Sequence, residues 1–524
     1  MHQCLRIPEV VRNICDCLAQ SHLLSVALTS LTLLEPALDS IWESIDTFDP
    51  IIACLPADLW RKDEVEGPSG DSYTSLFLRR PIEEKDLTRY LTRYAGRIRD
   101  IDFNFQPGDR ILALEGFQGL QLVTRYRPGA LSPNLKSFEW LSPTPLQELV
   151  GVDFSRQLSP YMSLFIGESV VSLSSADQAD NPLHIAAIRS TIERLPRLKS
   201  LNVADHTEEP LRDYYLEQYT YMAHLQYLTM NSLSPEAVSR IALLPSLRNL
   251  TVWDDRSNEL HSAVLETLAR GPRITDGFRS LRAIAVTSDR PTSIMTLLPS
   301  LPHTNMVKRI TCNMDTATSP EEWQEVVDAV GTYGNPDTLD DLYLDSSVMC
   351  PVEREVLDMK FRPEVKITAL TKFRKLAKLM LRFEGGVQVR AEDIPAIRDA
   401  WPKMCSLNLL PTQACHSRIP AINHTHVLEI LKGCPNLDIL ALRFDTTQLT
   451  DEEAEADCKF DLGILCVGAS PIWSPSIVAK FIRSYFPDLR RLGVYYPGRL
   501  GDTATKGRPM RDKRWSAVLK ELEL

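Results

Sequence analysis

VLEILKGCPNLDILAL, residues 427–442, joins a helical pattern to a strand pattern. Apolar residues at helical spacing fill its first positions. Gly433 and Pro435 then predict that the helix ends near Cys434, because proline lacks an N–H and pushes the preceding residue out of helical geometry. A Leu-x-x-Leu-x-Leu frame follows over 437–442, and its last two leucines point to one face of a short strand. The stretch is one helix–turn–strand unit.

The chain repeats this frame along most of its length. One unit cannot bury its apolar face, but stacked units can. The pattern therefore predicts an α/β solenoid of irregular leucine-rich repeats, with a curved parallel sheet on the inner face and helices outside. The first residues of successive Leu-x-x-Leu-x-Leu frames lie 22 to 37 residues apart. The fourteen predicted strands are Ile98–Phe103, Pro133–Trp140, Tyr161–Ile166, Pro196–Val203, Leu225–Met230, Pro245–Val252, Leu281–Val286, Val307–Cys312, Leu339–Leu344, Leu376–Leu381, Pro402–Leu409, Leu437–Leu442, Leu462–Val467 and Pro487–Val494.

Two features depart from the usual leucine-rich repeat. The spacing exceeds the roughly 20–29 residues typical of the class. The asparagine usual after the last strand leucine is also missing, and aspartate often stands there, at Asp255, Asp289, Asp315 and Asp445. An aspartate carboxylate accepts hydrogen bonds from backbone N–H groups, but it cannot donate hydrogen bonds as the side-chain amides of an asparagine ladder do. An ordinary α/β domain with leucine-rich strands is the alternative.

Composition narrows the class of protein. The 524 residues are 44% hydrophobic and carry a net charge of −11 without a long basic stripe, which disfavours nucleic-acid binding. No apolar run approaches the roughly 18 residues of a membrane-spanning helix, and the first residues do not resemble a signal sequence. The eleven cysteines are odd in number and form no CxxC pair. They favour reduced thiols in a cytoplasmic or nuclear protein.

Residues 1–46 lack the repeat frame and are typical of a small helical module. Pro8 is expected at the start of the first helix, where its missing N–H costs nothing. The module has more apolar surface than so short a segment can bury, so it needs a partner or a neighbouring domain.

The order of residues in this module resembles an F-box. Ile7-Pro8-Glu9 is followed by Ile14-x-x-x-Leu18, a leucine-rich helix and Ala37–Trp42, as in the fungal F-box/leucine-rich-repeat proteins. A departure is Ala27-Leu28-Thr29, where many F-boxes have Val-Cys-[Lys/Arg]. The resemblance implies docking on the Skp-type adaptor of a cullin–RING (SCF) ubiquitin ligase, with a target protein held by the repeats. The expected adaptor contacts are Leu5, Ile7, Pro8, Ile14, Leu18, Leu24, Leu28 and Trp42.

The composition of the remaining chain predicts three segments after the N-terminal module. Residues 47–72 are expected to connect the module to the repeats, and their charged, Gly/Pro-bearing part at 61–72 predicts an exposed loop. The solenoid spans 73–496, with Tyr73–Leu78 as a possible first strand and Glu83–Ala95 as a helix. Residues 497–524 are expected to form a basic tail and a short terminal helix.

No motif for catalysis, phosphate binding or a cofactor occurs in the chain. Its one Cys/His cluster matches no zinc template and comprises Cys415, His416, His424, His426 and Cys434. The sequence therefore favours a non-catalytic substrate receptor without cofactor or metal. A repeat scaffold outside ubiquitination, whose N-terminal helices only cap the solenoid, is the alternative, and an enzyme on an α/β fold has no supporting motif.

The inner face of the predicted sheet is the expected target-binding surface. In each frame the third and fifth residues, and the one after the frame, point away from the core. Tyrosine, tryptophan and arginine, which are enriched at binding hot spots, recur at these positions. The candidates are Tyr227, Asn249, Trp253, Arg309, Asp341, Tyr343, Asp345, Lys378, Arg382, Arg443 and Tyr495. Alternatively, Asp341 and Asp345 only pair with Lys378 and Arg382 on the adjacent strand.

Overall fold

The computed structural model divides into two compact units, residues 1–231 and 232–524, and each is considered by itself. The structure describes residues 7–67, 70, 72–103, 108–140, 157–175, 182–203, 222–231, 233, 235–254, 277–316, 318–346, 364–412, 419–455, 458–494 and 510–523.

A parallel sheet runs through the first unit, with neighbouring strands in sequence order. It begins with a strand of only two residues, Ser44–Ile45, which pairs with the strand at Asp100–Asp102. The frame residues point into the core, where Ile101 lies beside Phe138 and Leu173 beside Leu201. The six strands are β1 (Ser44–Ile45), β4 (Asp100–Asp102), β6 (Ser137–Trp140), β7 (Ser172–Ser175), β8 (Ser200–Val203) and β9 (Tyr227–Asn231).

The second unit continues the same construction with nine parallel strands. Leu342, Leu379, Leu407, Leu440 and Leu465 occupy matching positions on five successive strands, and all five are buried. The strands are β10 (Asn249–Asp254), β11 (Ala283–Ser288), β12 (Arg309–Met314), β13 (Asp341–Ser346), β15 (Lys378–Arg382), β17 (Ser406–Asn408), β18 (Ile439–Ala441), β19 (Ile464–Cys466) and β20 (Arg491–Gly493). The leucine frame thus correctly predicted strand direction, order and buried face.

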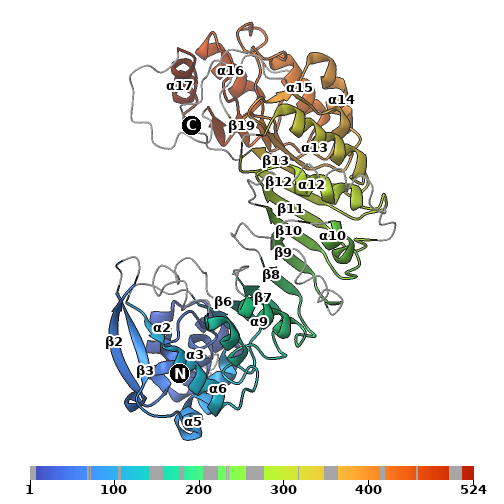
Figure 1. Cartoon of the computed structure of the whole chain (residues 1–524). Helices are drawn as coiled ribbons and strands as arrows, with labels where there is room; N and C mark the ends of the chain where they lie inside the picture. Colours follow the sequence, from blue (N-terminus) through green and yellow to red (C-terminus); the bar gives the residue numbers. More distant parts are fainter. Residues whose placement is uncertain are drawn as a thin grey trace. The chain divides into compact units, whose positions relative to one another are not determined.

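Helices connect successive strands, and Figure 1 shows α12 and α13 beside strands β11 to β13. Ser319 and Glu322 form the predicted capping box at the start of α13. Helix α15 ends at Gly433 as expected, where a Cβ would come within 2.6 Å of the Arg398 carbonyl oxygen. The helices of the second unit are α10 (Pro235–Ile241), α12 (Thr292–Leu297), α13 (Pro320–Tyr333), α14 (Ile394–Ala400), α15 (His424–Gly433), α16 (Pro475–Tyr485) and α17 (Met510–Leu522).

One of the fourteen predicted strands is wrong. Tyr161–Ile166 lies mostly in a 3-10 helix, η4 (Ser159–Leu164), and the strand at this place in the sheet is β7 instead. The β7 frame begins with Val170 and has serine at its sixth position, so it lacks the leucine pattern. Tyr161, Leu164 and Ile166 have the right spacing and are buried, but they pack around the helical turn. Apolar spacing alone does not distinguish these two geometries.

The segment between the module and the repeats also differs from prediction. Residues 61–66 are not a loop, because β2 (Trp60–Glu66) pairs antiparallel with β3 (Ser72–Leu78). The predicted strand at Tyr73–Leu78 exists, but it belongs to this separate sheet, which β5 (Arg110–Leu112) completes. The charges of β2 lie on an exposed edge, where Arg61 pairs with Asp63 at 3.0 Å. Such charges are a common feature of edge strands.

The predicted helix at Glu83–Ala95 is present as α5, whose Arg93 end leads into a short 3-10 turn. The helices of the first unit are α1 (Pro8–Asp16), α2 (Gln20–Thr29), α3 (Leu31–Ile41), α4 (Asp49–Cys54), α5 (Glu84–Arg93), α6 (Leu114–Val123) and α9 (Pro182–Ile192). None of the helices in the described ranges is both long and apolar enough to cross a membrane.

His184, at the start of α9, gives the first unit a testable pH dependence. It is buried between Ser159 Oγ at 2.9 Å and Ser175 Oγ at 3.3 Å, and burial lowers the pKa of its imidazole to about 4. The unfolded chain binds this proton near pH 6.5, so the unfolded state holds more protons between pH 6.5 and 4. Stability should therefore fall by about 3 kcal/mol as pH drops through that window.

Denaturant unfolding of the wild type and the His184→Gln variant at pH 7.0 and pH 4.5 tests this expectation. The variant should lose less stability between the two pH values than the wild type loses. An equal loss would show that other groups cause the acid sensitivity.

Candidate protein-binding surfaces

The N-terminal module consists of α1, α2 and α3 around a small core. Pro8 occupies the first turn of α1, as predicted. Val11, Cys15, Leu23 and Ala27 meet Ala37 in the interior, and Ser30 caps α3 by accepting the N–H of Thr32 at 3.2 Å. The core of the module is small, and other apolar side chains of its three helices lie outside it.

The outside of the module carries apolar side chains on all three helices. Leu24 is 58% exposed and Leu28, one turn later on α2, is 78% exposed. Ile7 and Ile14 are exposed at 48% and 42%, and Leu31 follows at the start of α3. We call Ile7, Ile14, Leu24, Leu28 and Leu31 the apolar face. Scattered exposed apolar residues are normal, but five on one module of three short helices suit a partner surface.

Two of the predicted adaptor contacts, Leu18 and Trp42, do not belong to the apolar face. Trp42 is buried, with its ring 4.4 Å from that of Tyr94, so it is part of the core rather than the apolar face. The reason is tertiary: Trp42 stands two residues before β1 and takes the first position of a repeat frame, as Ile98 does before β4. Leu18 is half-buried against the module's own core. Leu5 lies outside the described residues.

The module is fixed to the first repeats. Arg97, in the turn before β4, donates to the carboxylates of Glu35 and Asp39 and to the Glu35 carbonyl oxygen at 3.3 Å. Its side chain is mostly buried, which strengthens these charge-assisted hydrogen bonds. Together with Trp42 and the pairing of β1 with β4, they hold α3 against the sheet. The apolar face therefore has a fixed orientation relative to the repeats of the first unit.

The inner face of the second unit gathers charged residues on β12, β13 and β15. Arg309 Nε lies 3.1 Å from Asp341 Oδ2, and Arg382 lies 3.5 Å from Asp345. Tyr343 donates to Asp345 at 2.9 Å, and burial with this carboxylate raises the pKa of the Tyr343 phenol. The expected pair of Asp345 and Arg382 thus exists, whereas Asp341 pairs with Arg309.

The remaining candidates on the inner face differ in accessibility. Trp253 and Lys378 are exposed, and Asn249 is half-buried on β10. Tyr227, which is exposed, belongs to the first unit. Tyr495 lies outside the described residues. The most accessible part of this surface centres on Trp253, Arg309 and Lys378.

Sequence reasoning missed an acidic row on the inner face of the first unit. Asp100 and Asp102 on β4 point to the same side as Glu139 on β6, and Asp102 is directly opposite Glu139. Burial and the Asp102 carboxylate raise the pKa of Glu139. The sequence shows these acids at the outward-pointing third and fifth positions of two frames. Only the pairing register of β4 with β6 shows that they are neighbours.

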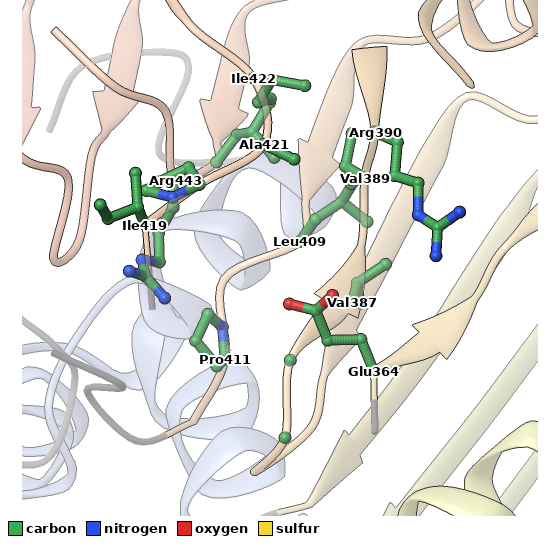
Figure 2. Close-up of a pocket in the computed structure, with 14 residues that line it drawn as sticks. Glu364, Val387, Val389, Arg390, Leu409, Pro411, Ile419, Ala421, Ile422 and Arg443 are labelled. Atoms are coloured by element: carbon green, nitrogen blue, oxygen red, sulfur yellow. The ribbon is translucent and has the colours of Figure 1, made fainter. Parts of the chain in front are cut away.

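A small pocket lies where β15, β17 and β18 end, and Arg443 contributes to it (Figure 2). In Figure 2, Arg443 and Ile419 lie on one side, with Val387 and Glu364 on the other. The cavity of about 130 Å³ is smaller than the roughly 300 Å³ at which small-molecule sites begin. Arg390, at its edge, pairs with Glu392 at 3.0 Å.

The Cys/His cluster is not gathered around a common point in the described chain. His424 is buried 3.6 Å from Glu453, and His426 lies against the capping Asn423. Cys434 Sγ lies 3.4 Å from the Trp401 carbonyl oxygen. Cys415 and His416 lie outside the described residues. Within the described ranges, no group of three or more metal-ligating residues is close enough to hold an ion.

Comparisons with known proteins give no family. No protein-family model matches the chain, and no curated protein matches its sequence. Among solved structures, one chain of the yeast complex of Rad7 and Elc1 aligns at 14% sequence identity and a TM-score of 0.32. The alignment covers 75% of this chain and 82% of that one. This TM-score is too low to show a shared fold.

Proposed function

We propose that the protein is a non-catalytic substrate receptor of an SCF-type ubiquitin ligase in the cytoplasm or nucleus. The observation that carries the proposal is the apolar face on a module fixed to a repeat scaffold. In this role the module docks on the Skp-type adaptor, which connects to the cullin, and the repeats bind a target protein. The F-box-like order of Ile7-Pro8, Ile14 and Leu18 supports this choice of partner.

The apolar face suits a helix of the adaptor. Leu24 and Leu28 are one turn apart on α2, so their side chains project from the same side of the helix. Burying an exposed leucine contributes about 1.5–3 kcal/mol. Two such anchors account for a substantial part of the affinity of a peptide-in-groove interface, in which a few apolar residues dominate.

A repeat scaffold without a ubiquitin role is the second candidate. The contacts of Trp42 and Arg97 favour it, because they are also what a terminal cap needs to cover the end of a sheet. The two readings differ at the apolar face, since a cap gives no reason to expose Leu24 and Leu28.

The decisive experiment replaces Leu24 and Leu28 together by glutamine, which keeps helix propensity high while removing apolar surface. Adaptor binding, measured with purified Skp-type adaptor, should weaken at least about 100-fold. The melting temperature should change little, because both side chains are already in water. Leu243→Gln, at an exposed leucine of the second unit, is the control and should bind normally. Unchanged binding by the double variant, or no binding by the wild type, would favour the scaffold.

A further inference from the structure

The first unit has a groove on the edge of the sheet where strands begin. The groove lies between the loops that precede β6, β7 and β8 and encloses about 910 Å³. Gly129 forms its floor, because its φ of +67° and its approach to Gly167 leave no room for a side chain. Arg127, Arg194 and Arg197 line it, and we call it the arginine groove. It is separate from both the apolar face and the inner face.

Basic residues predominate around the arginine groove. Beside its three arginines, Lys136 places Nζ 3.5 Å from the carbonyl oxygen of Ser169, which lines the groove. Lys199 is the residue before β8, as Lys136 is before β6, and its backbone N–H donates to the Val171 carbonyl oxygen. Glu168 and Glu193 are the acidic residues of the lining. Three arginines against two glutamates leave the lining with an excess of one positive charge, on a chain whose net charge is −11.

The positive charge is available to a partner. Arg127 and Arg197 are exposed, and neither forms an ion pair with any residue in the described part of the chain. Arg127, which lines the groove, follows Arg125 and Tyr126, two residues in a left-handed turn with φ values of +54° and +55°. A second cavity of about 610 Å³ shares Arg127, Gly129 and Pro133, so the concave surface continues towards α5.

We propose that the arginine groove binds an acidic segment of a partner protein. The guanidinium groups of Arg127 and Arg197 pair with carboxylates of the segment, as arginine forks do elsewhere. Pro196 is exposed in the lining of the groove and suits an aliphatic side chain between the acids. Nucleic acid fits less well, because the described residues of the lining include no aromatic side chain for base stacking.

The test is fluorescence anisotropy with the full chain at low salt, using a labelled ten-residue peptide of alternating glutamate and leucine. A peptide with glutamine in place of glutamate, and a labelled oligothymidine, serve as comparison probes. The acidic peptide should bind, the glutamine peptide should not, and added salt should weaken binding. Arg127→Glu/Arg197→Glu should weaken it roughly tenfold or more, because two exposed attractions become repulsions.

The control is Arg374→Glu/Lys375→Glu, which makes the same change in net charge at exposed residues of the second unit. It should leave peptide affinity within about twofold of the wild type, since neither residue lines the groove. Should the first variant melt early, Arg127→Gln/Arg197→Gln removes the two charges without introducing repulsion. Equal losses in the two glutamate variants, no peptide binding by the wild type, or tighter binding of oligothymidine with the same sensitivity to Arg127 and Arg197 would each overturn the proposal.

Discussion

Replacing Leu440 by alanine is expected to lower the free energy of unfolding by about 2–5 kcal/mol. Leu440 is fully buried on β18, between Leu407 of β17 and Leu465 of β19. Its neighbours across the sheet are themselves held by backbone pairing, so they cannot collapse to fill the space that a leucine side chain leaves. The loss therefore includes both the transfer of the side chain and the cavity that remains.

Denaturant unfolding of the whole chain measures this loss, with Leu243→Ala as the matched control. Leu243 is 71% exposed, so the same truncation there should change stability by less than about 0.5 kcal/mol. Equal effects at the two positions would contradict the assignment of Leu440 to the core.

Replacing Trp42 by alanine is expected to cost about 3–5 kcal/mol, since a large buried aromatic side chain leaves a large cavity. The Trp42 ring stacks on Tyr94 and lies 6.3 Å from the ring of Tyr90, which is buried and donates to the Leu131 carbonyl oxygen. The substitution should therefore weaken the packing of the module against the sheet. If Trp42 contacted an adaptor instead, truncation would reduce binding and leave stability unchanged.

Thermal melting combined with adaptor binding distinguishes these outcomes. Trp473→Ala is the control, because Trp473 is mostly exposed and its ring meets only the Arg514 guanidinium, at 4.8 Å, among the ring contacts in the described ranges. That variant should lose less than about 1 kcal/mol. A Trp42→Ala protein with a wild-type melting temperature would show that the module is not anchored through this residue.

The local pattern of the chain was sufficient to predict its repeats. Leu342, Leu379 and Leu440 mark buried strand positions because period-2 leucines after a helix stop can bury only one face. Gly433 and Ser319 mark helix ends, since capping chemistry depends on residues close in sequence. In the same way, the position of Pro8 at the start of α1 follows from its missing N–H.

Tertiary structure decided the features that depend on distant neighbours. The charged strand β2 exists because β3 supplies its backbone partners, and β7 exists because β6 and β8 flank a serine-rich segment. Neither strand has the local leucine pattern that predicted the others.

For the binding surfaces, too, the sequence determined some features and the tertiary structure decided others. The sequence determined that the module carries more apolar side chains than it can bury, and so that some must be exposed. Only the tertiary structure decided that Trp42 is buried while Leu28 is exposed, because Tyr94 covers one and no described residue covers the other. It also brought Arg127 and Arg197, which are far apart in the chain, to one groove. Stacked parallel strands place equivalent loops side by side, and sequence spacing alone does not show which loop residues then face each other.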